Sequence, residues 1–396
     1  MILSGVPFVW ALSNSMIIPV LPEIQRALEL SSVKAGLLVT FLSVPTGLLL
    51  PLAGFLSDRL GRTRVMVPAL LAYGVGGLLV ALAAAYAPDP FPLMLAARAL
   101  QGVGAAGTTL LAMALAADLS RGESRVRALG ALEASNSVGK LVSPVMGSAA
   151  ALVVWYGPFL VYPVAAVPLA LLLSLTLREP PTEGAKRGTL MEYLSTLLTT
   201  MRSKGDSLAG TLLAGFAAIF LWFGTLFFLA EVLDERYRVG GTLRGLYLAL
   251  PVLAMALAAA LSGRHLAGLG LRAQAALGMA CTGVAATLSI LLGADFLVKA
   301  GVAFIGVGLG VTLPALNTMI TSLVAEDRRG MVTALYGTVR SFGSAFGPPA
   351  FGLMVALGDI PLFAAMLALS FLALCSLLLL VREKGQGSAA PSEEVD

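Results

Sequence analysis

The chain has 396 residues, of which 58% are hydrophobic and only 12% are charged. Soluble domains carry about 25% charged residues, so this composition excludes a soluble globular protein. The chain has a single histidine, His265, which excludes multi-histidine zinc sites and Ser–His hydrolases. Its two cysteines are isolated in apolar segments, which excludes a disulfide framework. We therefore expect no metal, no cofactor and no enzymatic activity. The net charge of +4 does not indicate nucleic-acid binding, because the basic residues lie in particular loops between apolar segments.

Long apolar segments alternate with short polar ones along the whole chain. Each apolar segment has about 20 residues, the length of a helix that crosses about 30 Å of hydrocarbon. The pattern predicts an all-α membrane protein with twelve transmembrane helices, the first of which is a span rather than a cleavable signal peptide. The predicted spans are 2–22, 34–56, 65–86, 92–116, 128–152, 157–177, 208–231, 243–262, 273–293, 297–321, 331–356 and 360–381.

The basic residues predict how these spans are oriented. Of the 26 lysines and arginines, 17 lie in the even-numbered loops, the middle segment and the tail, and six lie in the odd-numbered loops. Loops rich in Lys and Arg stay on the cytoplasmic side of a membrane. We therefore expect a multi-pass protein of the cell (inner) membrane with both termini in the cytoplasm. The other three basic residues, Arg98, Lys140 and Arg340, lie inside predicted spans.

The chain divides into two similar halves. Residues 1–178 and 207–382 each hold six predicted spans; between them, residues 179–206 predict a cytoplasmic linker with an amphipathic helix, and residues 383–396 predict a disordered tail. A shift of 204 residues pairs Gly102 with Gly306 and Pro144 with Pro348, and a shift of 209 residues applies nearer the start of each half. Duplicated bundles with a substrate path between them are typical of secondary transporters.

The loop between predicted spans 2 and 3 has the sequence Gly54-Phe-Leu-Ser-Asp-Arg-Leu-Gly-Arg-Thr-Arg64. It resembles the G-x-L-[AS]-D-R-x-G-R motif of the major facilitator superfamily. Its arginines can pair with carboxylates or helix C-termini of the other half, and its glycines allow close helix approach. We expect a conformational latch, the alternative being an ordinary positively charged loop. The expected latch residues are Gly54, Asp58, Arg59, Gly61 and Arg62.

Predicted span 4 contains Arg98-Ala-Leu-Gln-Gly102, which resembles the R-x-x-Q-G element of the superfamily. The following glycines also fit a dinucleotide-binding pattern, but no strand precedes them, so this interpretation is excluded. A charged residue inside a membrane is costly and usually faces a cavity and a partner. We therefore expect Arg98 to take part in coupling, and the alternative is a side chain that reaches the outer interface.

Predicted span 5 contains Gly139-Lys-Leu-Val-Ser-Pro-Val-Met-Gly147. It resembles the G-x-x-x-G-P-x-x-G-G element of the drug:proton antiporters in the superfamily, with Ser143 in place of the second glycine. Gly139, Ser143 and Gly147 recur every four residues and predict a helix-packing face, with Pro144 bending the helix. The alternative is a packing face that says nothing about the direction of transport.

The same span carries polar residues on one face. Glu133, Asn136 and Lys140 lie at i, i+3 and i+7, and Arg340 in span 11 occupies the position of Asn136 after the 204-residue shift. Intramembrane charges are costly, so the set predicts a polar substrate cavity, the alternative being buried structural ion pairs. Asn14 in span 1 is a further cavity candidate, although a lone asparagine often makes a hydrogen bond between helices.

The resemblance to the major facilitator superfamily covers the whole chain and implies two pseudo-symmetric six-helix bundles that work by alternating access. It implies proton-coupled export of small organic molecules by a monomer in the lipid bilayer. A carboxylate in a low-dielectric cavity takes up a proton more readily than in water, so Glu133 is the expected proton carrier, followed by Asp118. The positive cavity favours anionic, zwitterionic or neutral substrates over purely cationic ones. Uptake or exchange of an organic anion and a non-transporting membrane scaffold are the alternatives.

Overall fold

The computed structural model describes residues 2–177, 199, 205–325 and 328–381, and the described part is helical throughout, without strands. Nine helical segments of this part are long and apolar enough to cross a membrane. The other three predicted spans are also helical, but span 1 is broken into short helices, and spans 5 and 11 are more polar. The predicted amphipathic helix of the linker and the predicted disordered tail lie outside the described residues.

The first half contains eight α-helices. Span 1 comprises α1 (Gly5–Ala11) and α2 (Leu21–Leu28), separated by a turn around Asn14 and a 3-10 helix, and span 4 is divided at Gly107 and Thr108. Both interruptions lie within continuous apolar sequence, where hydropathy alone predicts unbroken helices. The remaining helices are α3 (Ser32–Leu60), α4 (Arg62–Tyr86), α5 (Pro90–Ala106), α6 (Thr109–Leu119), α7 (Gly122–Ala151) and α8 (Gly157–Thr176).

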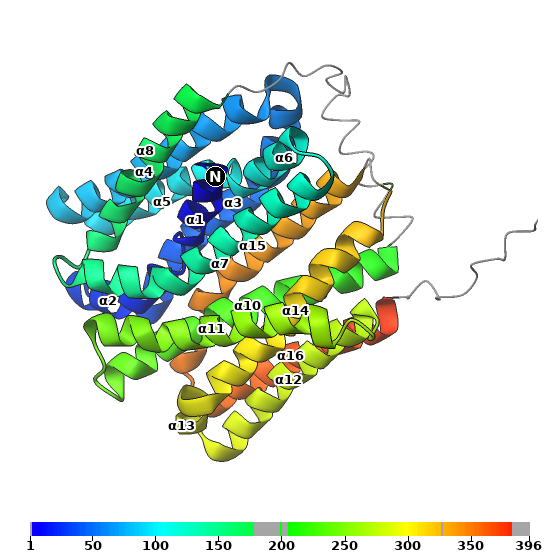
Figure 1. Cartoon of the computed structure of the whole chain (residues 1–396). Helices are drawn as coiled ribbons and strands as arrows, with labels where there is room; N and C mark the ends of the chain where they lie inside the picture. Colours follow the sequence, from blue (N-terminus) through cyan, green and yellow to red (C-terminus); the bar gives the residue numbers. More distant parts are fainter. Residues whose placement is uncertain (1, 178–198, 200–204, 326–327, 382–396) are drawn as a thin grey trace, which may run out of the picture.

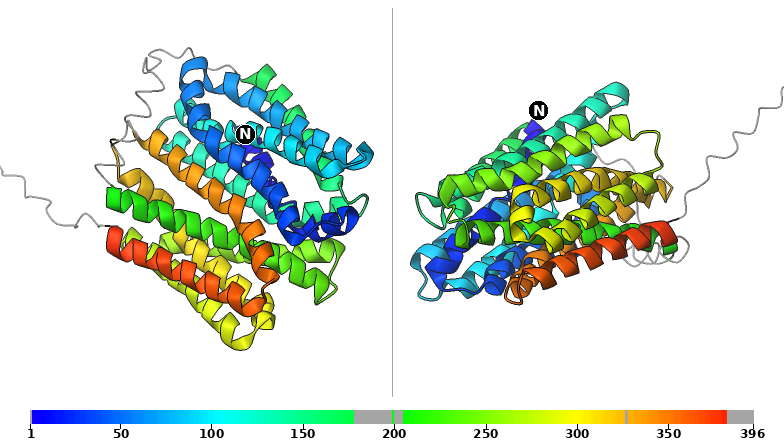
Figure 2. Two further views of the ribbon diagram at one scale, coloured as in Figure 1. Left: turned by 180° about the vertical axis from the view of Figure 1, so that it is seen from behind. Right: turned by 90° about the horizontal axis from the view of Figure 1, so that it is seen from below.

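The second half forms a bundle of its own beside the first. Figure 1 shows α1 to α8 of the first half, coloured blue to green, above α10 to α14 and α16 of the second half, with the orange α15 between the two groups; the left view in Figure 2 shows the same arrangement from behind. Span 10 begins with a short helix and a five-residue π-helical turn before α14. The helices are α10 (Gly205–Glu235), α11 (Gly241–His265), α12 (Leu271–Leu292), α13 (Ala294–Phe296), α14 (Val302–Ser322), α15 (Arg329–Val355) and α16 (Asp359–Leu380).

The internal repeat predicted from the sequence is visible in matching helix contacts. A Cβ atom added to Gly102 on α5 would collide with the carbonyl oxygen of Leu42 on α3. A Cβ atom added to Gly306 on α14 would lie 2.5 Å from the carbonyl oxygen of Pro251 on α11. Leu42 and Pro251 are related by the 209-residue shift, and the two glycines are related by the 204-residue shift. The two halves therefore repeat their packing as well as their sequence.

The halves meet along two helix pairs, α3 with α15 and α7 with α11. The α3–α15 pair can be followed in the left view of Figure 2, where the orange helix lies beside the blue one. Hydrogen bonds cross this pair from the Thr40 hydroxyl to the Ala345 carbonyl (2.6 Å) and from the Thr338 hydroxyl to the Gly47 carbonyl (2.7 Å). The interface is thus closely packed along the first part of α3.

The same interface opens toward the end of the molecule that carries Asp58, which we call the Asp58 end. Gly36, Gly47 and Gly54 lie on one face of α3 because they are separated by 11 and 7 residues. An added Cβ would lie 2.7 Å from Pro349 at Gly36 and 2.9 Å from Ser341 at Gly47, but at Gly54 it would meet no described atom within 4 Å. The two halves therefore separate toward the Asp58 end.

The α7–α11 pair opens in the same direction. Gly245, near the start of α11, packs against Pro144 and Ser148 of α7, and an added Cβ there would lie 2.6 Å from the Ser148 hydroxyl oxygen. Gly263 lies five turns further along the same face of α11, and an added Cβ there would meet none of the described atoms within 4 Å. The molecule is closed at the opposite end, which we call the Arg244 end, and is open at the Asp58 end.

Candidate functional site

Three polar residues predicted for a cavity lie together on α7. The Asn136 amide nitrogen donates a hydrogen bond of 3.3 Å to a carboxylate oxygen of Glu133, and Lys140 follows one turn later. Glu133 is exposed and Lys140 is half-buried, whereas Asn136 is 5% exposed. The amide oxygen of Asn136 is buried and has no hydrogen-bond partner among the described residues. It is therefore an acceptor whose donor is not found in the described part of the chain.

Arg340 faces these residues from the second half. Both Glu133 and Arg340 act electrostatically on Lys140, so two cations and one carboxylate from α7 and α15 share one region. The Arg340 guanidinium lies 5.3 Å from the centre of the Tyr336 ring and 3.4 Å from the side-chain oxygen of Asn317 on α14. We call Glu133, Asn136, Lys140 and Arg340 the central cluster. Asn317 was not among the predicted cavity residues, although it is a lone amide in an apolar span as Asn14 is.

Arg98 and Asn14 lie inside the first half and not with the central cluster. Arg98 is 0% exposed, so the predicted alternative of a side chain reaching the outer interface is wrong. Its guanidinium donates to the Leu38 carbonyl (2.8 Å), the Gln101 amide oxygen (2.8 Å) and the Asn14 amide oxygen (2.9 Å). Asn14 in turn donates to the Ser43 hydroxyl oxygen (2.8 Å). Asn14 therefore makes the interhelical hydrogen bond that was the alternative to a place in the cavity.

The predicted latch residues Asp58, Arg59 and Arg62 lie at the Asp58 end and have partners there. Arg62 pairs with Asp58 (3.3 Å) and with Asp118 at the end of α6 (2.5 Å), and the Arg59 guanidinium lies 4.3 Å from the centre of the Phe55 ring. These three partners belong to the first half, and pairing of the two arginines with the second half stays a prediction.

The glycines of the latch have separate geometrical roles. Gly61 adopts φ of 102°, a backbone conformation that glycine adopts without strain, and it ends α3 immediately before α4 begins. Gly54 borders the open part of the interface between the halves.

The small-residue face predicted on span 5 packs against the broken first span. An added Cβ at Gly139 would lie 2.8 Å from the Ala11 side chain and 2.9 Å from the Phe8 carbonyl. Gly147 lies against Met16, and Ser143 is completely buried, with its hydroxyl donating to the Lys140 carbonyl (3.0 Å). This face fixes the position of α7 and thereby of the central cluster.

A second set of charged residues, not predicted as a site, closes the Arg244 end. Arg244 in the first turn of α11 was counted as a loop residue, but its side chain is completely buried. It pairs with Glu23 of α2 (2.7 Å) and with Asp234 of α10, and Arg26 pairs with the same Asp234 (3.1 Å). We call these four residues the Arg244 cluster. The sequence signal was weak, because the acids lie 221 and 10 residues from Arg244.

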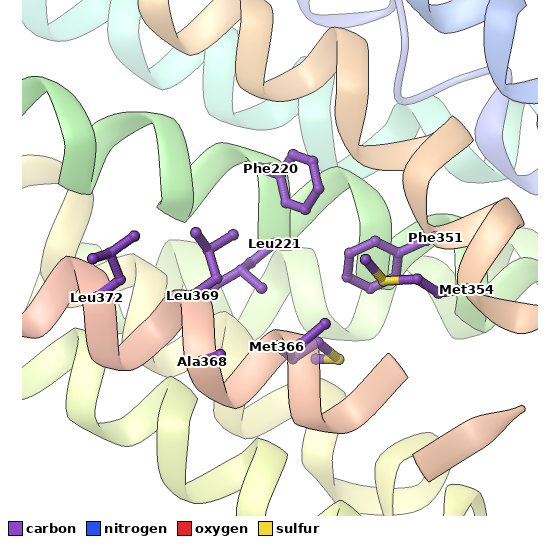
Figure 3. Close-up of a pocket in the computed structure, with 9 residues that line it drawn as sticks. Phe220, Leu221, Phe351, Met354, Met366, Ala368, Leu369 and Leu372 are labelled. Atoms are coloured by element: carbon purple, nitrogen blue, oxygen red, sulfur yellow. The ribbon is translucent and has the colours of Figure 1, made fainter. Parts of the chain in front are cut away.

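An apolar pocket of about 350 Å³ lies apart from both charged clusters (Figure 3). It is formed between α10, α15 and α16, and its labelled side chains include Phe220, Phe351 and Leu369. It contains no residue of the central cluster. This pocket therefore offers apolar contacts and is separate from the charged residues of the central cluster.

Comparison with known families decides the class of the molecule. The model of the Major Facilitator Superfamily matches residues 3–295 and 211–395. The chain belongs to this superfamily. It is 32% identical over 360 residues to the bacillibactin exporter of Bacillus subtilis (strain 168), with 89% of each chain covered. It is also 26% identical to the class C tetracycline resistance protein of Escherichia coli, with 85% of each chain covered.

Solved structures of the superfamily have the same fold. The human organic anion transporter MFSD10 (TETRAN) superposes with a TM-score of 0.72 at 18% identity, covering 95% of this chain and 98% of that one. A bacterial homolog of the human lysosomal transporter Spinster, in an inward-facing and unoccupied conformation, has a TM-score of 0.69 at 18% identity, with 96% and 93% covered. The predicted major facilitator fold of two helical bundles is confirmed.

Proposed function

We propose that this member of the superfamily exports small organic molecules by alternating access, driven by inward proton movement. Two relatives that match most of the chain, the bacillibactin exporter and the class C tetracycline resistance protein, support export of small organic molecules. The splayed Asp58 end supports alternating access, since one end of the interface between the halves is closed while the other is open. The charge bias of the loops supports a cytoplasmic position for the Asp58 end and both termini.

The substrate binds at the central cluster and is anionic, zwitterionic or neutral with strong acceptor groups. Lys140 and Arg340 come from different halves, and each acts as a charge-assisted donor. A cationic substrate 4 Å from either residue would be repelled by about 1–4 kcal/mol, depending on the effective dielectric constant. The single observation that carries this proposal is the convergence of two cations from opposite halves beside the unpartnered Asn136 oxygen.

Glu133 carries the proton in this scheme. It is the one carboxylate of the central cluster, and it is exposed. Its charge acts on Lys140, so a change in its protonation alters the charge that the substrate meets. Asp118 already pairs with Arg62 at the Asp58 end, which makes it the weaker carrier.

The test is transport by the purified protein in proteoliposomes. Matched fluorescent anions and cations of similar size, together with bacillibactin, are tested with and without a pH gradient. We expect anion transport that depends on the gradient and falls at least tenfold in Lys140→Ala and Arg340→Ala. Lys299→Ala is the matched control, because Lys299 is exposed at the Arg244 end and pairs with Asp295. Cation transport that neither central substitution affects would contradict the assignment of the substrate.

A further inference from the structure

The Arg244 cluster joins the two halves where they are in contact. Glu23 and Arg26 lie on α2 in the first half, whereas Asp234 and Arg244 lie on α10 and α11 in the second. Two ion pairs therefore cross the interface between the halves, Glu23 with Arg244 and Arg26 with Asp234. Arg244 also donates to the Pro19 carbonyl of the first half (3.0 Å), so one guanidinium holds two groups of the opposite half.

A second contact across the halves lies beside the first. Glu231 on α10 is 4% exposed and accepts hydrogen bonds from the Gln25 amide (2.5 Å) and the Ser32 hydroxyl (3.0 Å). Both donors belong to the first half. With the Arg244 cluster, these bonds replace the water that would otherwise hydrate the buried charges of this end.

Arg244 makes different numbers of bonds in the two states of the transporter. Its bonds to Asp234 and to the Val239 carbonyl (3.0 Å) lie within the second half and persist when the halves rock. Its bonds to Glu23 and Pro19 exist only while the Arg244 end is closed. An interaction made in one state and not in the other shifts the equilibrium between them.

We propose that Arg244 is the gating residue that closes the extracytoplasmic end of the transport path, by binding Glu23 and Pro19 across the two halves. Removing its charge favours molecules that are open at the Arg244 end. The proposal rests on the proposed function for the two states of alternating access and for naming this end extracytoplasmic, but not for the substrate or the proton. The test of the gating proposal measures conformation without any substrate, so this proposal and the proposed transport function can fail separately.

The experiment measures the distance between spin labels at the Arg244 end of each half. Labels at Asp89 and Leu292, both exposed, are introduced after replacement of the native cysteines Cys281 and Cys375 by serine. In Arg244→Gln we expect the ratio of separated to closed molecules to rise about tenfold, which corresponds to one charge-assisted hydrogen bond. Arg244→Lys keeps one charge and is expected to restore part of the closed population.

Two further variants make the outcome decisive. Glu23→Gln keeps the shape of a side chain that is 23% exposed, and it should shift the ratio in the same direction even if Arg244→Gln does not fold. Arg236→Gln is the matched control, because Arg236 pairs with Asp359 (3.1 Å) within the second half. The proposal is overturned if Glu23→Gln leaves the distance distribution unchanged, or if Arg236→Gln shifts it as much as Arg244→Gln does.

Discussion

Replacing the paired glycines Gly102 and Gly306 by alanine tests the packing on which both halves depend. An added Cβ at Gly306 would lie 2.5 Å from the Pro251 carbonyl oxygen, whereas real Cβ atoms essentially never come within 3.0 Å of a neighbour. The helix axes must therefore move apart by at least about 0.5 Å, because a backbone carbonyl has no rotamer to change. The equivalent collision at Gly102 involves the Leu42 carbonyl and is closer still.

The magnitude follows from two opposing effects. Overpacking a close helix contact costs about 1–3 kcal/mol, while alanine in place of glycine stabilises a helix by about 1 kcal/mol. At Gly130 and Gly263 an added Cβ meets none of the described atoms within 4 Å, so only the second effect applies. The free energies of unfolding of the two pairs of variants should therefore differ by about 1–3 kcal/mol.

The assay is thermal unfolding of the purified variants in one detergent. A change of 1 kcal/mol moves the melting temperature of a domain of 150–250 residues by about 2–4 °C, so the two pairs should differ by about 2–12 °C. Gly102→Ala and Gly306→Ala should melt below the wild type, and Gly130→Ala and Gly263→Ala at or above it. If Gly102→Ala and Gly306→Ala melt at as high a temperature as Gly130→Ala and Gly263→Ala, the close approach of these helices is refuted.

Three substitutions test the charged sites. Asp58→Asn keeps the side-chain shape but removes the charge beside Arg62, so we expect a well-folded protein with impaired transport; wild-type flux would exclude a latch. Glu133→Gln mimics the protonated acid and should abolish dependence on the pH gradient while substrate exchange persists; unchanged gradient-driven flux would assign the proton elsewhere. Arg98→Lys cannot keep all three donated bonds, and each lost charged hydrogen bond costs about 1.5–3 kcal/mol, so its melting temperature should fall. An unchanged melting temperature would show that these bonds add nothing.

The sequence alone determined the local properties of this protein. Apolar length predicted the membrane spans, because a helix satisfies its own backbone hydrogen bonds in lipid. In the part of the chain described here, nine helical segments are long and apolar enough to cross a membrane. The repeat was also readable, since glycines at close helix contacts recur at fixed shifts in both halves. The polar face of α7 was predicted from helical spacing, which depends only on neighbouring residues.

The partners of the charged residues were decided by the tertiary structure. Arg98 was recognised as costly, but its partners are neutral groups on other parts of the first half. Arg62 pairs with Asp118 at the end of α6, a partner that the sequence analysis did not assign to it. The sequence did not distinguish Arg244 from a loop arginine, because its partner across the halves, Glu23, lies 221 residues away in the sequence. An ion pair depends on distances of a few ångströms, and sequence periodicity carries no information about which distant helices approach that closely.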